Sequence, residues 1–385
     1  MTSSALSQVG ERERASVKFA EIDWLLFTVV CLIGAAGIAM LYSIAGSSWK
    51  PWALNQVLRF GVGVVLMLTL ALISLRVVFF LAYPIYAVAL ALLAVVPFIG
   101  TESHGGRRWL DIGPVQLQPS ELMKIGLVLA LARFYQGISA KEANFSWKLL
   151  IPAALIAVPA GLVKIEPDLG TCILLLLTGA AVVVLAGLSF RVIAAAVVAG
   201  LASIPVIIEF GLEPYQRERI MTMFTGHDSD PHGAGFQIKQ GIIAMGSGGV
   251  LGRGYGLGSQ SQLSFVPEKH TDFIFATFAE EFGFVGCASI LFLFALAIFI
   301  SLRIAAVSHS HFGRLAAAGV TATFAAYLMI NGAMVMGLAP VVGIPMPLMS
   351  YGGTVMLTVM IGFGLVQCVR VHRYDEVGSG RGTLF

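Results

Sequence analysis

The chain has 385 residues, of which 57% are hydrophobic and only 12% are charged, and its mean hydropathy is +0.87. About a quarter of the residues in a soluble domain are charged, so this composition excludes a soluble globular protein and indicates a polytopic membrane protein. The formal net charge of +3 is small and scattered, which gives no basis for nucleic-acid binding.

The N-terminal segment 1–22 is polar and carries Arg12, Arg14 and Lys18. It lacks the basic start, short apolar core and small-residue cleavage site of a signal peptide. We therefore expect it to be a cytoplasmic tail, matched by a second cytoplasmic tail over residues 372–385.

Ten apolar runs lie between these tails, each close to the roughly 20 residues that a helix needs to cross about 30 Å of hydrocarbon. They lie near residues 23–44, 55–75, 77–99, 119–136, 147–164, 168–187, 190–210, 272–304, 312–337 and 349–371. We expect an all-α polytopic membrane protein with a single transmembrane domain over 23–371. Its ten transmembrane helices leave one large outer loop, residues 211–271, between spans seven and eight.

The distribution of Lys and Arg predicts the orientation. With the N-terminus inside, thirteen basic residues fall on the cytoplasmic side, and six fall in short outer segments or the adjoining span ends. The positive-inside rule then favours cytoplasmic termini. This orientation places every polar, motif-bearing segment on the outer face: residues 100–118, 166–171, 211–271 and 337–353.

The outer loop contains ten glycines between Gly233 and Gly258. It has no GxxxxGK[ST] motif and no GxGxxG between a strand and a helix, so a nucleotide-binding loop is excluded. Two interpretations remain open. The stretch is either a flexible loop or backbone that approaches a ligand closely, which glycine alone permits.

Five polar residues, 268–272, directly precede the eighth apolar run. Asp272 could simply cap that helix, because an acid in the first turn favours the positive end of the dipole. A cap does not explain the whole polar run, which lipid penalises, so Asp272 is our first candidate for a catalytic residue. Glu280 and Glu281 lie about 12 Å further along the helix, too far to pair with Asp272, and we expect them to contact other helices.

Three cations, Arg59, Arg108 and Lys124, map to the outer ends of spans. Cations kept there against the positive-inside bias suggest a phosphate-bearing ligand. Glu121 and Lys124 share a helix face at i, i+3 and could equally form an ion pair. Asp168 has the same ambiguity between a site residue and a helix cap. The prolines and glycines of residues 340–353 predict a broken connection, which is tolerated only where it is buried in protein or lines a cavity.

Five motifs together resemble the SEDS family (shape, elongation, division and sporulation). They are GRRWLDIGPVQLQPSE, EPDLGT, GSGGVLGRGYGLGSQSQ, FVPEKHTDFIFATFAEEFG and GLAPVVGIPMPLMSYGG. The motif FVPEKHTDFIFA is more similar to the RodA branch than to the FtsW branch. The resemblance implies a peptidoglycan glycosyltransferase that polymerises lipid II on the outer face of the bacterial inner membrane, for cell elongation and shape. It also implies a class B penicillin-binding protein as a transpeptidase partner, and other elongation-complex proteins.

The resemblance places the family's essential acid on Asp272. It places cavity-lining, substrate-binding residues on Arg59, Arg108, Trp109, Glu121, Lys124 and Asp168. Asp272 would be the general base, the cations would hold the pyrophosphate of the polyprenyl leaving group, and the displacement would be inverting. A divalent cation, Mg²⁺ or Mn²⁺, held by Asp168 or Glu121 is compatible with a pyrophosphate ligand. Glu166 stands where the family has glutamine, and we treat it as peripheral.

Two other functions stay open from the sequence. The first is a flippase or transporter of lipid-linked cell-wall precursors, for which Glu280 and Glu281 would be the best support. The second is a non-catalytic assembly scaffold, in which Asp272 would be dispensable. Most candidate residues lie at outer span ends rather than at the midplane, which favours the enzyme.

Overall fold

The computed structural model describes residues 18–103, 106–113, 115–138, 147–225, 233–263 and 265–377. Most of the two predicted tails, with Arg12, Arg14 and Arg381, therefore lies outside the described residues, as do His104 and Lys141 of the loops. The division of the chain into two tails and one domain stays a prediction.

Ten helices lie where the apolar runs predict spans. They are α2 (Trp24–Ile44), α3 (Ala53–Leu72), α4 (Leu75–Ile99), α5 (Pro119–Gln136), α6 (Leu150–Ile165), α7 (Leu169–Leu185), α8 (Phe190–Val206), α12 (Ile274–Val307), α13 (His311–Val335) and α14 (Gly353–Val371). Seven described helices are long and apolar enough to cross a membrane; α6 and α7 are shorter, and α5 carries three charged residues. The helical, polytopic class is confirmed, whereas the number of ten spans stays a prediction.

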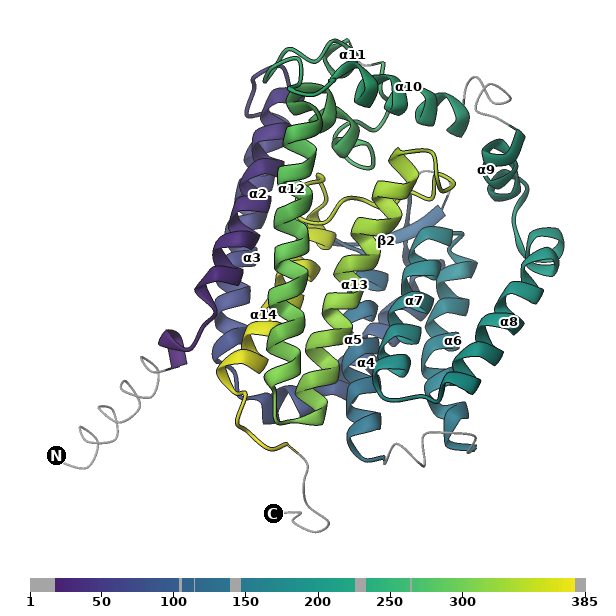
Figure 1. Ribbon diagram of the computed structural model, residues 1–385. Helices are drawn as coiled ribbons and strands as arrows, with labels where there is room; N and C mark the ends of the chain where they lie inside the picture. Colours follow the sequence, from purple (N-terminus) through teal and green to yellow (C-terminus); the bar gives the residue numbers. More distant parts are fainter. Residues whose placement is uncertain are drawn as a thin grey trace.

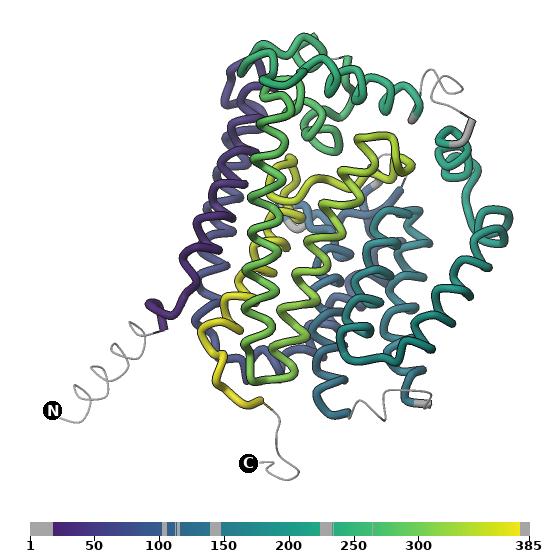
Figure 2. The backbone as a smooth tube through the Cα atoms, in the orientation of Figure 1, coloured from purple at the N-terminus to yellow at the C-terminus, as the bar shows by residue number. Residues whose placement is uncertain are grey.

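Helices α5 and α14 form the centre of the bundle, and most of their residues are buried. By contrast, α8 has no buried residue and stands apart from the other helices at the edge of the molecule (Figure 2). Its apolar side chains therefore face the surroundings, as expected for a helix exposed to lipid.

The described chain begins and ends at the same end of the bundle (Figure 1). Gln367 near the end of α14 and Asp23 before α2 exchange two hydrogen bonds: the Asp23 amide donates to the Gln367 side chain, and that side chain donates to the Asp23 carbonyl, both at 2.9 Å. Asp23 also caps α2 by accepting from the Leu26 amide. An even number of crossings is consistent with this arrangement.

The opposite end carries the outer segments. The described parts of the segment 100–118 include a small antiparallel sheet of β1 (Thr101–Ser103), β2 (Gly106–Ile112) and β3 (Val115–Leu117), which was not predicted from the sequence. The outer loop forms three short helices, α9 (Pro214–Thr225), α10 (Ala234–Ser247) and α11 (Ser259–Gln262); α10 and α11 lie above the bundle, and α9 lies at its edge near the end of α8 (Figure 1). Of these segments, the sheet, α9 and α10 contribute to the lining of the space described below as the candidate site.

The predicted 33-residue span at 272–304 is divided at Gly283, which has φ 64° and ψ −163°. The part from Phe284 to Val307 is about 36 Å long and can cross the membrane alone. The Phe284 amide donates to the Gly249 carbonyl at 3.0 Å, so the kink is bonded to the glycine-rich stretch. A Cβ at Gly283 would overlap the Gly252 nitrogen and lie 2.7 Å from the Val250 carbonyl oxygen. The glycines of this stretch therefore permit backbone to approach backbone.

We expect Gly283→Ala to lower the free energy of unfolding by about 3 kcal/mol or more, because it combines a left-handed φ with overlap in a packed region. Gly61→Ala is the matched control, since Gly61 lies inside α3 with no atom near its Cβ position. Thermal unfolding in detergent measures both. Equal melting temperatures for the two variants would contradict the packing assigned to Gly283.

Candidate active site

A cavity of about 580 Å³ lies at the end of the bundle that carries the predicted outer segments. All four predicted outer segments contribute to it, the segment 211–271 partly through α9, together with residues of α5 and α13. Its polar lining includes Arg108, Trp109, Gln118, Glu121, Lys124, Asp168, Tyr215, Arg219, Glu268, Asp272, Tyr327 and Tyr351. Six of the seven residues singled out from the sequence therefore surround one space, although they lie up to 164 positions apart in the chain.

Asp272 lies in the turn before α12, with its side chain partly exposed to the cavity. The helix begins two residues later, its N-cap position is Phe273, and no described side chain caps it. The interpretation of Asp272 as a helix cap is therefore wrong. The carboxylate Oδ2 lies 3.6 Å from the position that a Cβ would take at Gly343, in the broken connection before α14.

The backbone of residues 270–272 is fixed by three successive hydrogen bonds. The Tyr351 amide donates to the first carbonyl at 2.9 Å, and the Ser350 hydroxyl donates to the second at 2.6 Å. The Asn331 side chain donates to the third at 2.8 Å and to the Ile344 carbonyl at 2.7 Å. Because Asn331 is fully buried, it holds the Asp272 turn and the broken connection together.

The surroundings change the acidity of Asp272. Burial against protein, and next the negative charge of Glu268, raise its pKa; the positive charge of Arg219 lowers it, the charge of Asp168 raises it, and together these effects bring the pKa to about 7. A carboxylate with a pKa near neutrality is far better suited to accept a proton from a hydroxyl than an ordinary aspartate.

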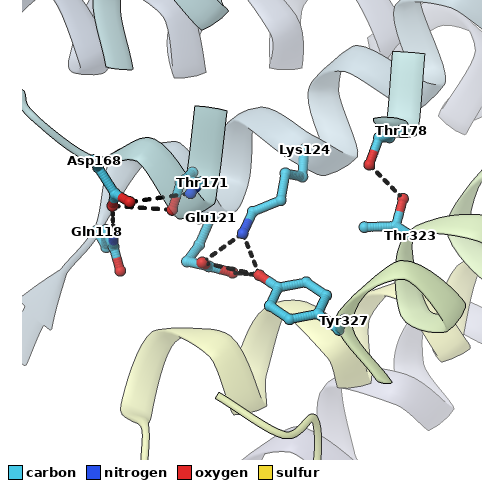
Figure 3. Close-up of polar contacts among 8 residues, drawn as sticks. All are labelled: Gln118, Glu121, Lys124, Asp168, Thr171, Thr178, Thr323 and Tyr327. Atoms are coloured by element: carbon cyan, nitrogen blue, oxygen red, sulfur yellow. Dashed lines mark hydrogen bonds and ion pairs between the residues drawn. The ribbon is translucent and has the colours of Figure 1, made fainter. Parts of the chain in front are cut away.

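Glu121, Lys124 and Tyr327 form a buried cluster at the inner wall of the cavity (Figure 3). The Lys124 ammonium donates to Glu121 Oε1 at 2.6 Å and also to the Tyr327 hydroxyl oxygen, while that hydroxyl donates to Glu121 Oε2 at 2.8 Å. Lys124 is 1% exposed and Glu121 is 3% exposed. The ion pair considered from the sequence is therefore present, and both of its members also line the cavity.

Asp168 caps α7 by accepting hydrogen bonds from the Thr171 amide at 3.0 Å and the Thr171 hydroxyl at 2.9 Å (Figure 3). The Gln118 side chain donates to its second oxygen at 3.4 Å. Asp168 is thus both a helix cap and part of the cavity wall.

Arg108 and Trp109 lie on β2, and both face the cavity. Arg108 donates to the carbonyls of Glu166 at 3.2 Å and Pro167 at 2.7 Å, which holds the α6–α7 turn against the sheet. Glu166 is only 3% exposed but does not line the cavity, so its burial belongs to the α6–α7 turn and its peripheral place in the site stays a prediction. Its burial, and next the charge of Asp168, raise its pKa to about 8, while Arg108 lowers it.

Arg59 lies outside the lining of the cavity, although it was predicted there from the sequence. Its guanidinium lies 4.7 Å from the ring centre of Tyr351, which does line the cavity. Arg59 therefore contacts a residue of the lining, Tyr351, but does not line the cavity itself.

The lining residues Arg219 and Tyr327 were missed from the sequence, as was Asn331, which holds the Asp272 turn without lining the cavity. Tyr327 and Asn331 are polar residues at i, i+4 within the apolar span α13, and that spacing was an available signal. Arg219 shares a face of α9 with Tyr215 at the same spacing, but only the folding of α9 over the cavity makes it part of the site.

Glu280 and Glu281 bind the glycine-rich loop. The amides of Gln260 and Ser261 donate to Glu280 at 2.8 and 3.0 Å, and the amide of Gly256 donates to Glu281 at 3.1 Å. Glu281 also accepts a hydrogen bond from Ser43 at the outer end of α2, so its expected contact with another helix is present. Both carboxylates are used to hold the loop against α12.

The carboxylates proposed for a divalent cation do not fit that role as they stand. Asp168 is engaged with Thr171 and Gln118, and Glu121 with Lys124 and Tyr327. In the part of the chain that the structure describes, no group of three or more His, Cys, Asp or Glu side chains could hold a metal ion. We therefore derive no step of the reaction through a metal.

Comparison with known proteins places the chain among cell-wall enzymes. The FtsW/RodA/SpoVE family model, described as a cell cycle protein, matches residues 20–375. The chain is 45% identical to the peptidoglycan glycosyltransferase MrdB of Escherichia coli K12 over 82% of its length and 84% of the relative's. A chain of a solved peptidoglycan synthase complex is 32% identical, with a TM-score of 0.79 over 92% of this chain and 99% of that one. The crystal structure of the rod shape determining protein RodA of Thermus thermophilus is 30% identical, with a TM-score of 0.70 over 92% and 98%.

Proposed function

The chain belongs to the FtsW/RodA/SpoVE family, and on that premise we propose that it polymerises lipid II into glycan strands at the outer face of the bacterial inner membrane. It is a multi-pass membrane peptidoglycan glycosyltransferase for cell elongation, as its similarity to MrdB and RodA indicates. The termini would be cytoplasmic. This orientation is supported by the excess of basic residues on the cytoplasmic side, thirteen against six in the short outer segments and span ends. It is also supported by the position of both ends of the described chain at one end of the bundle (Figure 1).

The observation that carries the proposal is the position of Asp272. Its backbone is held at three consecutive carbonyls, and its carboxylate, with a pKa of about 7, faces a polar cavity large enough for sugar units. In the reaction, the 4-hydroxyl of an acceptor sugar attacks the anomeric carbon of a donor and expels polyprenyl pyrophosphate. Asp272 accepts the hydroxyl proton as that bond forms.

The departing pyrophosphate requires positive charge, and three cavity cations supply it. Arg219 donates to the Val341 carbonyl at 3.1 Å, two residues from the Gly343 position that Asp272 approaches, so this arginine lies beside the proposed base. Arg108 lies on β2 and donates to the Pro167 carbonyl, which also accepts from the Tyr215 hydroxyl of α9. Lys124 uses two of its three donors on Glu121 and Tyr327, which leaves one for a phosphate oxygen.

Arg219→Ala should lower kcat/KM for lipid II by about tenfold to a hundredfold, the loss expected for a hydrogen bond to a charged group. Arg217→Ala is the matched control, because Arg217 lies two positions away, is 38% exposed and pairs with Glu209 outside the cavity lining. Steady-state polymerisation kinetics measure the difference. Equal kinetics for the two variants would remove Arg219 from the site.

The rate of polymerisation should rise with pH through about 7. Because the base is the deprotonated form, the active fraction would grow from about a tenth at pH 6 to about nine tenths at pH 8. A pH–rate profile of the purified protein measures this rise. A flat profile over that range would contradict Asp272 as the titrating base.

A direct test of the function is a polymerisation assay with purified protein and lipid II, alone and with a class B penicillin-binding protein. The structural similarity to a chain of a synthase complex supports such a partner. A chelator arm tests whether Mg²⁺ or Mn²⁺ bound with the pyrophosphate takes part. Absence of glycan product under all conditions would refute the enzyme. Movement of lipid II across vesicle membranes would then favour a flippase, and the absence of both activities would favour a scaffold. Glu280 and Glu281 no longer support transport, because both carboxylates bind the glycine-rich loop.

A further inference from the structure

A second polar site lies at the end of the bundle opposite the catalytic cavity. It is a small pocket of about 20 Å³ between α12 and α14, lined by Arg303, Ile304, Val307, Arg370 and Arg373. Three of its five lining residues are arginines, and no described acid lines it. The catalytic proposal makes no use of this pocket.

The arginines are incompletely neutralised. Arg303 and Arg370 share a single carboxylate oxygen, Asp23 Oδ2, at 3.5 Å and 4.0 Å. The Nε of Arg370 is buried and has no hydrogen-bond partner among the described residues. Arg373 is paired with Glu21. The Arg370 side chain is 30% exposed, so the rest of its guanidinium reaches the mouth of the pocket while its Nε stays buried without an acceptor. Because a buried donor without an acceptor is costly, an additional anion at the pocket would stabilise this end of the bundle.

The pocket opens beside a surface that faces lipid. Phe299, Arg303 and Val307 follow one another at i, i+4 and i+8 on α12, and they therefore share one helix face. Phe299 is 65% exposed, Val307 is 50% exposed and the Arg303 side chain is 58% exposed. Phe299 lies one turn deeper in the membrane than Arg303, so an apolar strip continues from the basic pocket toward the bilayer centre.

We propose that this pocket binds the phosphate of an anionic phospholipid. Its volume holds about one oxygen-sized group, so a single phosphate oxygen enters between the arginines while the rest of the headgroup stays at the mouth. The acyl chains lie along the strip formed by Phe299. A basic pocket between membrane helices on the side that we assign to the cytoplasm is suited to such headgroups.

The test measures lipid binding to the full chain, reconstituted with phosphatidylcholine and titrated with phosphatidylglycerol while bound lipid is counted by native mass spectrometry. Arg303→Gln should weaken phosphatidylglycerol binding by about fivefold, the effect of one basic residue near an anionic surface. Arg303→Lys should retain most of the binding. The matched control is Arg76→Gln, an exposed arginine at the same end of the bundle, at the start of α4 and outside the pocket.

Arg370→Gln should also weaken binding, and the more exposed Arg303 keeps the test valid if the Arg370 variant does not fold. Equal phosphatidylglycerol binding by the wild type, Arg303→Gln and Arg76→Gln would overturn the proposal. Displacement of the lipid by an equal concentration of inorganic phosphate would also overturn it, because the pocket would then be a general anion site. Unchanged melting temperature of Arg303→Gln in phosphatidylcholine alone separates lipid binding from fold stability.

Discussion

Replacing Asp272 with asparagine should lower the rate of lipid II polymerisation by about 10²–10⁴-fold, the usual contribution of a general base. Asparagine keeps the shape of the side chain but cannot accept the proton at neutral pH. The three hydrogen bonds that fix the turn use main-chain carbonyls, so they are unaffected by the substitution. The variant should therefore remain folded, as thermal unfolding can check, while product formation from lipid II is nearly abolished.

Glu268→Gln is the matched control for Asp272→Asn. Glu268 lies in the same turn, lines the same cavity and accepts a hydrogen bond from the Thr271 hydroxyl at 2.8 Å. Because its charge raises the pKa of Asp272, its removal should move the rise in the pH–rate profile to lower pH while leaving the plateau rate within about threefold. An equal loss of plateau rate in both variants, or near wild-type turnover by Asp272→Asn, would show that Asp272 is not the base.

The positions of the spans were predictable because hydrocarbon thickness dictates the length of an apolar run. The predicted bounds of α5, 119–136, agree with the structure, and those of α2 differ by one residue at the start. The division of α12 was not predictable, since it depends on contacts between Gly283 and glycines about thirty residues earlier. The sheet at 101–117 was missed because its strands are short and its pairing depends on turns within the loop.

The candidate site was predictable where a residue is anomalous in its local context. Asp272 and Lys124 stand out because charge at the end of an apolar span is costly. Arg219 shows the limit of this reasoning for the site, and Glu166 shows it for burial. Arg219 reaches the cavity only because α9 folds over it, and Glu166 is buried only because the α6–α7 turn lies against β2. Neither relation is visible in the local sequence.

Lys124→Met should have a large effect on stability as well as on activity, because it leaves the Glu121 carboxylate buried without its cation. Breaking a buried ion pair in this way typically costs about 3–5 kcal/mol. The double variant Glu121→Gln, Lys124→Met removes both charges, and the introduced amide oxygen can still accept from the Tyr327 hydroxyl. Its stability should therefore return to within about 1 kcal/mol of the wild type. The free energies of unfolding of the wild type, the two single variants and the double variant give the interaction free energy between Glu121 and Lys124.

The double variant also separates the two roles considered for Lys124. If the lysine only neutralises Glu121, then a stable protein without either charge should polymerise lipid II at nearly the wild-type rate. We expect instead that kcat/KM remains lower by about tenfold or more, because the cavity loses one charged donor to the pyrophosphate. Full recovery of both stability and kinetics would reduce Lys124 to a structural ion pair. Of the three cavity cations, only Arg108 and Arg219 would then stabilise the charge of the leaving pyrophosphate.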